Sequence, residues 1–178
     1  MRKKPEKMVV LGGGPIGCEL TQAFTRLGVQ VTQIEMLPRL LLREDVEISA
    51  LVQDKFVAEG VELLTGHAAK RFFRRDGQNY VVAEAESGSV EIEFDALIVA
   101  VGRAARTEGF GLEEMGVQLR PNRTIEVNEY LQTNIPTIYA CGDVTGPYQF
   151  THVAAHQGWY TSVNSLFGLI KRFKVDYS

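Results

Sequence analysis

The sequence predicts an α/β protein in which helices cover a parallel sheet and a small antiparallel meander follows. Two observations carry this prediction. Through residue 65, short apolar segments alternate with longer segments in which apolar residues recur every three or four positions, as on one face of a helix. Beyond residue 75, turn signals separate segments of alternating apolar and polar residues, which is the pattern of antiparallel strands.

The first part of the chain is expected to run strand, helix, strand, helix, strand. The strands are predicted at residues 7–12, 29–35 and 61–65, and the helices at residues 14–27 and 45–58. Short connections between such elements favour parallel strands. In the second helix, the apolar residues expected to face the sheet are Val46, Leu51, Val52 and Phe56.

The meander follows the third strand. Arg75-Asp76-Gly77 and Ser87-Gly88-Ser89 are turn signals that border predicted strands at residues 80–85 and 90–94. The apolar run over residues 96–101 predicts a buried strand. Beyond it the chain is loop-like, and its expected elements are a short helix at residues 112–115, short strands at 124–127 and 137–141, and a helix at 152–167.

The composition is that of an ordinary globular protein and excludes several classes of function. The 178 residues contain 19 basic and 22 acidic side chains, so the net charge of −3 gives no electrostatic case for a nucleic-acid partner. No apolar run reaches the ~18 residues of a membrane span, so we expect no membrane insertion. Cys18 and Cys141 lie in neither a CxxC nor a zinc spacing, which is typical of a reduced, cytoplasmic protein.

The stretch Gly12-Gly13-Gly14-Pro15-Ile16-Gly17 matches the pattern G-x-G-x-x-G. A predicted strand precedes it, a predicted helix follows it, and Glu35 closes the next strand, which together form the dinucleotide fingerprint of a Rossmann-like sheet. The first glycine permits a tight turn, the second lets a pyrophosphate approach the backbone, and the third lets the helix pack closely. The helix N-terminus then offers free N–H groups to the phosphates.

Glu35 is expected to accept hydrogen bonds from the hydroxyls of the adenosine ribose. A 2′-phosphate beside this carboxylate would be repelled, so the sequence predicts NAD rather than NADP. Two alternatives stay open. The glycines can belong to a turn in an unrelated α/β domain, and Glu35 can be a solvated carboxylate at a strand end.

A second motif lies near the end of the chain. Residues 133–143 read Thr-Asn-Ile-Pro-Thr-Ile-Tyr-Ala-Cys-Gly-Asp, after the glycine fingerprint, Glu35 and Gly102-Arg103. With these motifs, nearly the whole chain resembles the flavin-dependent pyridine nucleotide–disulfide oxidoreductases, of the dihydrolipoamide dehydrogenase and mercuric reductase type. The resemblance implies an NAD(H)-binding domain at residues 1–102 and the returning C-terminal part of an FAD-binding domain at residues 103–178.

The resemblance also implies roles for individual residues of the first domain. Gly12 to Glu19 would hold NAD, with Glu35 on its ribose, Gly66 to Ala68 on the adenine side and Gly102 against the nicotinamide end. Glu19 would lie near the flavin and support catalysis by pairing with a lysine, for which no match can be assigned here. The alternative for Glu19 is a solvated helix residue.

FAD is placed by the resemblance at the second motif. Asp143 would bind the ribityl chain, and Phe150, Thr151 and His152 would approach the flavin ring. The alternative for Asp143 is an ordinary turn residue. His152 and His156 lie four residues apart on one predicted helix face, but no third ligand is evident, so we expect no metal.

The resemblance finally implies a middle piece of a larger protein. Family members carry an earlier FAD fingerprint, a C-x4-C redox pair and a C-terminal dimerisation domain. The expected partners are therefore NADH and the missing FAD and dimerisation segments of a homodimeric parent. The implied reaction passes a hydride from NADH to FAD and on to a disulfide or another acceptor, and the isolated chain is expected to be inactive. Two alternatives remain: a non-catalytic dinucleotide-binding or redox-sensing module, and a small flavoprotein whose glycine fingerprint binds FAD.

Overall fold

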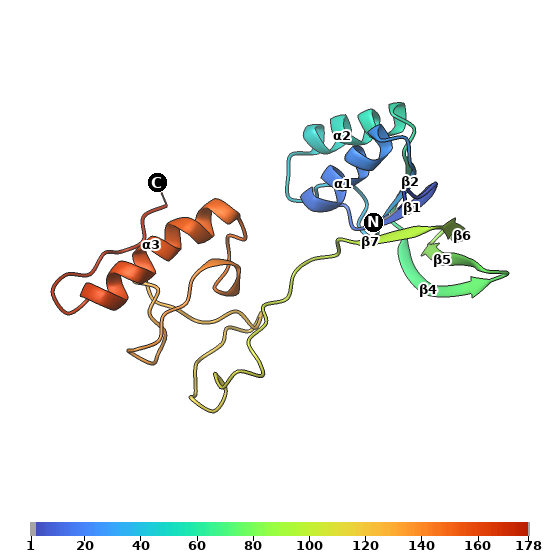
Figure 1. Ribbon diagram of the computed structural model, residues 1–178. Coiled ribbons are helices and arrows are strands. Elements are labelled where there is room, and N and C mark those ends of the chain that lie inside the picture. The colour runs from blue at the N-terminus through green and yellow to red at the C-terminus, as the bar shows by residue number, and fades with distance from the viewer. Residues whose placement is uncertain (1–2, 178) are drawn as a thin grey trace. The chain divides into compact units, whose positions relative to one another are not determined.

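A computed structural model describes residues 3–177 of the chain. The chain divides into two compact units, Met1–Gly102 and Arg103–Ser178 (Figure 1). The first unit holds the sheets and two helices, and the second is mostly irregular chain packed on a long helix. Within the described residues, no helix is both long and apolar enough to cross a membrane.

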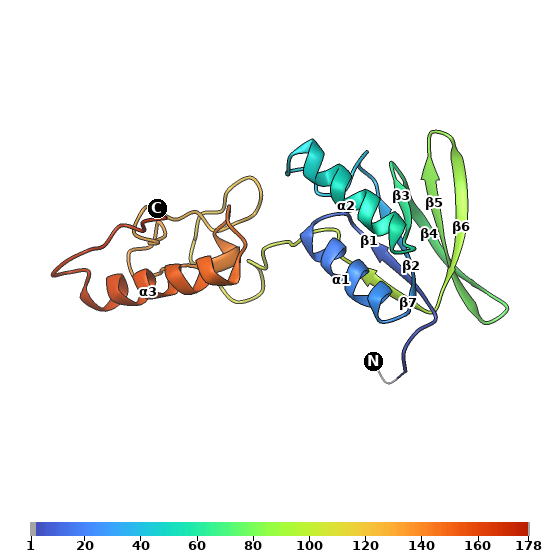
Figure 2. The ribbon, with the colours of Figure 1, turned by 90° about the horizontal axis from the view of Figure 1, so that it is seen from above.

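The first unit is built on a parallel sheet with the strand order β3-β2-β1-β7. These strands are β1 (Lys7–Leu11), β2 (Gln30–Glu35), β3 (Glu62–Thr65) and β7 (Ala96–Val99). Helices α1 (Pro15–Arg26) and α2 (Val46–Ala58) lie together on one face of this sheet (Figure 2). The predicted α/β fold with a Rossmann-like parallel sheet is confirmed.

A three-stranded antiparallel sheet packs on the opposite face. Its neighbouring strands are β4 (Ala68–Arg75), β5 (Gln78–Ala85) and β6 (Gly88–Phe94). Apolar side chains of β5 and β6 pack against Val9 and Ile34, whereas Met8 and Val10 pack with Phe24 of α1. Alternate residues of β1 therefore face different layers. The predicted meander is confirmed, although the sequence located only its second and third strands.

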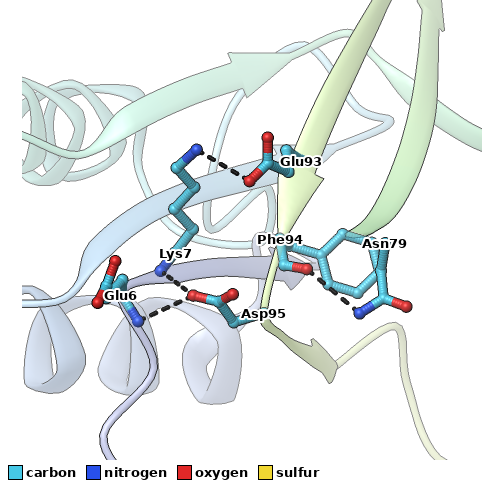
Figure 3. Close-up of polar contacts among 6 residues, drawn as sticks. All are labelled: Glu6, Lys7, Asn79, Glu93, Phe94 and Asp95. Carbon is cyan, nitrogen blue, oxygen red and sulfur yellow. Dashed lines mark hydrogen bonds and ion pairs between the residues drawn. The ribbon is translucent and has the colours of Figure 1, made fainter. Parts of the chain in front are cut away.

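Asp95 fastens the start of β1 to the connection between β6 and β7 (Figure 3). Its Oδ2 atom accepts hydrogen bonds from the backbone N–H groups of Lys7 and Glu6, at 2.9 and 3.0 Å. These two N–H groups, that of Lys7 above all, hold the pKa of Asp95 below its usual value. The ammonium group of Lys7 also reaches Glu93 of β6 at 3.1 Å, so the first residue of β1 is held twice.

The face that α2 turns toward the sheet differs from the prediction. Phe56 is buried as expected, but Val46 and Leu51 are 63% and 66% exposed. Ser49 is buried in their place, because its hydroxyl donates a hydrogen bond to the carbonyl oxygen of Leu40 at 2.6 Å. This bond ties the connection after β2 to the helix and turns a polar residue inward.

The apolar run at residues 96–101 forms a shorter and more exposed strand than predicted. β7 ends at Val99, which is 63% exposed. β7 lies at the edge of the sheet, and β1 is its one neighbour among the described strands. An edge strand is covered by less of the unit than a central strand is.

The second unit has little regular structure in its described part. Its helices are the short 3-10 helix η1 (Gly142–Val144) and α3 (Thr151–Phe167), and α3 confirms the predicted final helix. The predicted strands at residues 124–127 and 137–141 each form a single bridge rather than a ladder. The helix expected at residues 112–115 is a set of turns.

Candidate functional site

The turn between β1 and α1 shows why the fingerprint needs glycine. Gly12 has a φ of +105°, and a Cβ atom there would overlap the carbonyl oxygen of Ala100. A Cβ atom on Gly17 would overlap the carbonyl oxygen of Gly12, so α1 packs directly on the turn. Gly14 differs, because no atom of the described residues, its own chain neighbours apart, lies within 4 Å of its Cβ position. The space beside Gly14 is therefore open to a ligand that approaches the backbone.

The N-terminus of α1 faces this opening. Gly14 is the N-cap and Pro15 is the first helical residue, and within the described chain no side chain caps the helix. The first turn also contains no acidic residue. The first N–H groups of a helix have no intrahelical partner and carry the positive end of the helix dipole. The N–H groups of Ile16 and Gly17 are thus suited to an anion such as a phosphate.

Glu35 ends β2 and turns its carboxylate into the glycine turn. One carboxylate oxygen accepts a hydrogen bond from the backbone N–H of Gly13, and the other accepts one from the N–H of Leu37 at 2.7 Å. A Cβ atom on Gly13 would lie 2.9 Å from the Glu35 side chain, so a larger residue there would displace the carboxylate. The buried carboxylate retains further lone pairs that can accept hydrogen bonds from ligand hydroxyls.

The carbonyl side of the turn is held by residues that the fingerprint did not identify. Nε2 of Gln33 donates to the carbonyl oxygen of Gly12 at 3.0 Å. The thiol of Cys18 donates to the carbonyl oxygen of Gly13 at 3.5 Å. Burial raises the pKa of the Cys18 thiol, which keeps it protonated as a donor. Little in the sequence points to Gln33, because four of the six residues of β2 are polar.

The segment predicted to lie on the adenine side is fastened to the end of β2. The N–H of His67 donates to the carbonyl oxygen of Glu35 at 3.0 Å, and the N–H of Gly66 donates to that of Leu37 at 2.9 Å. Ala68, the third residue of this segment, begins β4. The structure therefore brings Gly66 to Ala68 beside Glu35.

Glu19 lies one turn into α1, and Gly102 directly follows Ala100 and Val101, whose backbone packs against Gly12. Glu19 is exposed on α1 and borders a cavity of about 390 Å³ between α1 and α2, which Lys55 and Phe56 also line. Among the described residues, no ion pair involves Glu19. Gly102 is exposed, with a φ of +131°, at the end of the first unit.

Asp143 lies in η1 of the second unit and pairs with Arg103, whose Nη1 atom is 2.5 Å from its Oδ2 atom. Both side chains are about half exposed and line a cavity of about 460 Å³ that Arg106 also borders. η1 is supported by α3, because the buried Gln157 accepts a hydrogen bond from the N–H of Gly142 at 2.6 Å. A carboxylate at this rim can accept hydrogen bonds from the hydroxyls of a polyol chain.

The start of α3 gathers the other predicted flavin contacts. Phe150 is the N-cap, Thr151 is the first helical residue, and the His152 ring stacks on Phe150 with the centroids 5.4 Å apart. His156 instead contacts the carbonyl oxygen of Asp176 at 2.6 Å, so the two histidines have different partners. In the described part of the chain, no group of three or more potential ligands is placed to hold a metal ion.

Comparison with known proteins adds independent evidence. A family model described as pyridine nucleotide-disulphide oxidoreductase matches residues 1–158. The chain is 44% identical over 156 residues to a dihydrolipoyl dehydrogenase of Bacillus subtilis, with 86% of this chain and 33% of the relative covered. It is 38% identical over 179 residues to a mercuric reductase of Lysinibacillus sphaericus, with 100% of this chain and 32% of the relative covered. The chain thus spans about a third of the length of these relatives.

Solved structures agree with this result. The HOCl-induced flavoprotein disulfide reductase RclA of Escherichia coli is similar, with a TM-score of 0.86 and 28% identity. The match covers 99% of this chain and 39% of that chain. A water-forming NADH oxidase of Lactobacillus brevis, solved with NADH bound, has a TM-score of 0.82 at 23% identity and shares the fold. That match covers 92% of this chain and 37% of the oxidase.

Proposed function

Because the chain belongs to the pyridine nucleotide–disulphide oxidoreductase family, as its motifs predicted, we propose that it contributes an NADH-binding domain to an FAD-dependent oxidoreductase. The observation that carries this proposal is the open glycine turn at the N-terminus of α1, with the carboxylate of Glu35 beside it. The chemistry that the two cofactors supply is hydride transfer from nicotinamide to flavin, with electrons passing on to a disulfide or another acceptor.

The proposed NADH site follows the carboxyl ends of the parallel strands, where ligands of such sheets bind. The open backbone at Gly14 and the N–H groups of α1 would bind the pyrophosphate. Glu35 would accept hydrogen bonds from the ribose hydroxyls, and the segment from Gly66 to Ala68 would lie on the adenine side. Gly102 would lie against the nicotinamide end. These groups bind and orient the cofactor, and none of them exchanges a proton with it.

The second unit would supply part of the FAD site. Asp143 would accept a hydrogen bond from a ribityl hydroxyl, while Arg103 restrains the carboxylate. Phe150, Thr151 and His152, at the start of α3, would approach the flavin ring. Glu19 would support catalysis from the exposed side of α1 in the whole protein.

A second candidate function is suggested by the same turn. An open glycine backbone and a free helix N-terminus bind the pyrophosphate of FAD as readily as that of NADH. In that case the chain is part of a flavoprotein whose glycine turn holds FAD. A non-catalytic dinucleotide-binding or redox-sensing module is the remaining alternative.

One experiment separates these candidates. The purified chain is titrated with NADH by calorimetry and, in parallel, mixed with FAD, desalted and examined by its visible spectrum. We expect weak NADH binding, no retained flavin and no NADH-dependent reductase activity, because the single G-x-G-x-x-G fingerprint of the sequence is assigned to NADH. A retained flavin band near stoichiometry would favour the second candidate. A full-length parent that purifies without flavin would favour the non-catalytic module.

For the parent protein we further propose a cytoplasmic homodimer. The proposed partners of the chain are NADH and the FAD and dimerisation segments of that parent. Light scattering of the full-length protein measures the oligomeric state, and cell fractionation measures the location.

A further inference from the structure

We propose that Gln33 is a positioning residue of the glycine turn and that it acts with Glu35 as a clamp on one peptide unit. Gln33 lies inside β2 with its side chain fully buried, and its Nε2 atom donates to the carbonyl oxygen of Gly12 at 3.0 Å. Two positions along the strand, Glu35 accepts a hydrogen bond from the N–H of Gly13. Side chains two residues apart on a strand share one face, so both reach the same turn.

The carbonyl of Gly12 and the N–H of Gly13 belong to a single planar peptide unit. In a trans peptide the oxygen and the hydrogen point in opposite directions. Gln33 holds the oxygen and Glu35 holds the hydrogen, so together they prevent rotation of the plane. The flanking glycines offer little resistance of their own, because they accept most backbone conformations. The clamp therefore sets the direction in which the backbone at Gly14 meets a ligand.

The amide of Gln33 is unfavourable for the core itself. Its Oε1 atom is buried and has no hydrogen-bond partner among the described residues. The other neighbour of its Nε2 atom is the Sγ atom of Cys18 at 3.8 Å, a weak acceptor. A half-satisfied amide costs folding free energy that an apolar side chain of equal size would not. We infer that this position carries an amide because its donor is needed by the turn.

The inference deepens the proposed function, because a rotated turn would weaken dinucleotide binding. Gln33→Met in the complete chain removes the donor and keeps the shape of the side chain. Hydrogen exchange by NMR reports on the amides of Gly13 and Gly14, and calorimetry reports on NADH. We expect exchange at Gly13 to become at least about 3-fold faster and NADH affinity to fall roughly 2- to 10-fold, which is the range for one hydrogen bond.

Thr21→Val is the matched control. The Thr21 hydroxyl is also buried between α1 and the sheet, and it has no hydrogen-bond partner within residues 3–177. Its loss removes an unsatisfied polar group from the same interface without touching the turn. Exchange at Gly13 and NADH affinity should both stay at the wild-type values.

The outcomes are distinct. Wild-type exchange at Gly13 together with wild-type NADH affinity in Gln33→Met would overturn the clamp. A second outcome would also overturn the clamp. If amide exchange becomes faster to the same extent throughout β1 and β2, with a lower Tm and no additional increase at Gly13, the role of Gln33 is purely structural. If the wild-type chain binds no NADH, the proposed function fails, whereas the exchange rate at Gly13 still decides whether the clamp exists.

Discussion

A Cβ atom on Gly17 would overlap the carbonyl oxygen of Gly12, so the third glycine of the fingerprint is required by the turn that the first glycine makes. Helix α1 and the turn are packed backbone to backbone at this point. Gly14, between them, has open space beside it in the described structure. Substitutions at these glycines should therefore separate stability from ligand binding.

Gly17→Ala is expected to destabilise the first unit by about 1–3 kcal/mol, the usual cost of forcing extra atoms into a packed site. Thermal unfolding followed by circular dichroism measures the effect. Gly158→Ala in α3 is the control, because no described atom outside the neighbouring backbone of α3 lies within 4 Å of its Cβ position. An alanine inside a helix is more stable than a glycine by about 0.5–1 kcal/mol. An unchanged Tm for Gly17→Ala would show that α1 can move away from the turn.

Gly14→Val is expected to leave the fold intact and to abolish NADH binding. The φ of Gly14 is −75°, which valine also adopts, and the branched side chain would fill the space that the pyrophosphate must approach. Circular dichroism checks the fold and calorimetry checks the affinity. A folded variant with wild-type affinity would place the pyrophosphate elsewhere.

The chain is expected to prefer NADH over NADPH by roughly 5- to 30-fold. At an effective dielectric constant of ~20, a 2′-phosphate about 4 Å from the Glu35 carboxylate would be repelled by up to about 4 kcal/mol per unit charge pair. Screening by salt reduces this repulsion to a fraction of that energy. Arg39 would not relieve the repulsion, because its guanidinium donates to the carbonyl oxygens of Leu41, Leu42 and Glu44.

The matching variant is Glu35→Gln, which removes the charge and should reduce the preference for NADH. Glu62→Gln, on the neighbouring strand β3, removes a charge that is bonded to Thr32 instead, and should leave the preference unchanged. Fluorescence titrations with NADH and with NADPH give the ratio of the two affinities for each variant. Equal affinities in the wild type would mean that Glu35 does not face the ribose.

Asp95→Asn is expected to lower the free energy of unfolding at pH 7 by about 1 kcal/mol, because the charge-assisted hydrogen bonds to Lys7 and Glu6 are weakened. The pKa of Asp95 is lower in the folded state than in the unfolded state. Its contribution is therefore complete above the unfolded pKa of about 4 and is lost as the pH falls through the folded pKa.

Urea unfolding at pH 7 and at pH 3 measures this dependence. The difference between wild type and Asp95→Asn should be smaller at pH 3. Asp54→Asn, on the exposed side of α2, serves as the control and should change stability little at either pH. If the wild type and Asp95→Asn differ in unfolding free energy by the same amount at both pH values, the charged carboxylate does not have this role.

Cys141 is expected to react with iodoacetamide well before Cys18. Cys18 is buried and burial raises its pKa, so little thiolate is present to react, whereas Cys141 is half-buried. Peptide mass spectrometry after brief labelling at pH 8 gives the order, and labelling in urea gives the reference for equal access. Equal rates in the folded protein would show that α1 opens readily.

The elements of the first unit were predictable because apolar repeats and glycines mark their ends, but the orientation of α2 was not. This helix has apolar residues on more than one side, so periodicity alone does not select the buried face. Ser49 turns inward because its hydroxyl bonds to Leu40, and a bond to a backbone carbonyl leaves no trace in the apolar pattern. Val46 and Leu51 are exposed as a result.

The candidate site was predictable where it depends on local backbone and not where it depends on strand register. The glycines and Glu35 follow from the fingerprint, whereas Gln33 is one of several polar residues in β2, and its role appears only when the strand lies beside the turn. Strands in the second unit were over-predicted for a related reason. An extended segment becomes a strand only where a neighbour pairs with it over several residues, and here each pairing is a single bridge.

The pairing of β1 with β7 has a consequence for synthesis on the ribosome. Met8 pairs with Ala96, and the N–H of Ala100 donates to the carbonyl oxygen of Leu11 directly before the glycine turn. The glycine fingerprint therefore leaves the ribosome long before β7, the strand that pairs with β1, has been synthesised. Until β7 emerges, Gly12 lacks the backbone of Ala100 against which it packs. Pairing between such distant segments forms late and slowly, so the binding turn matures at the end of the folding of this unit.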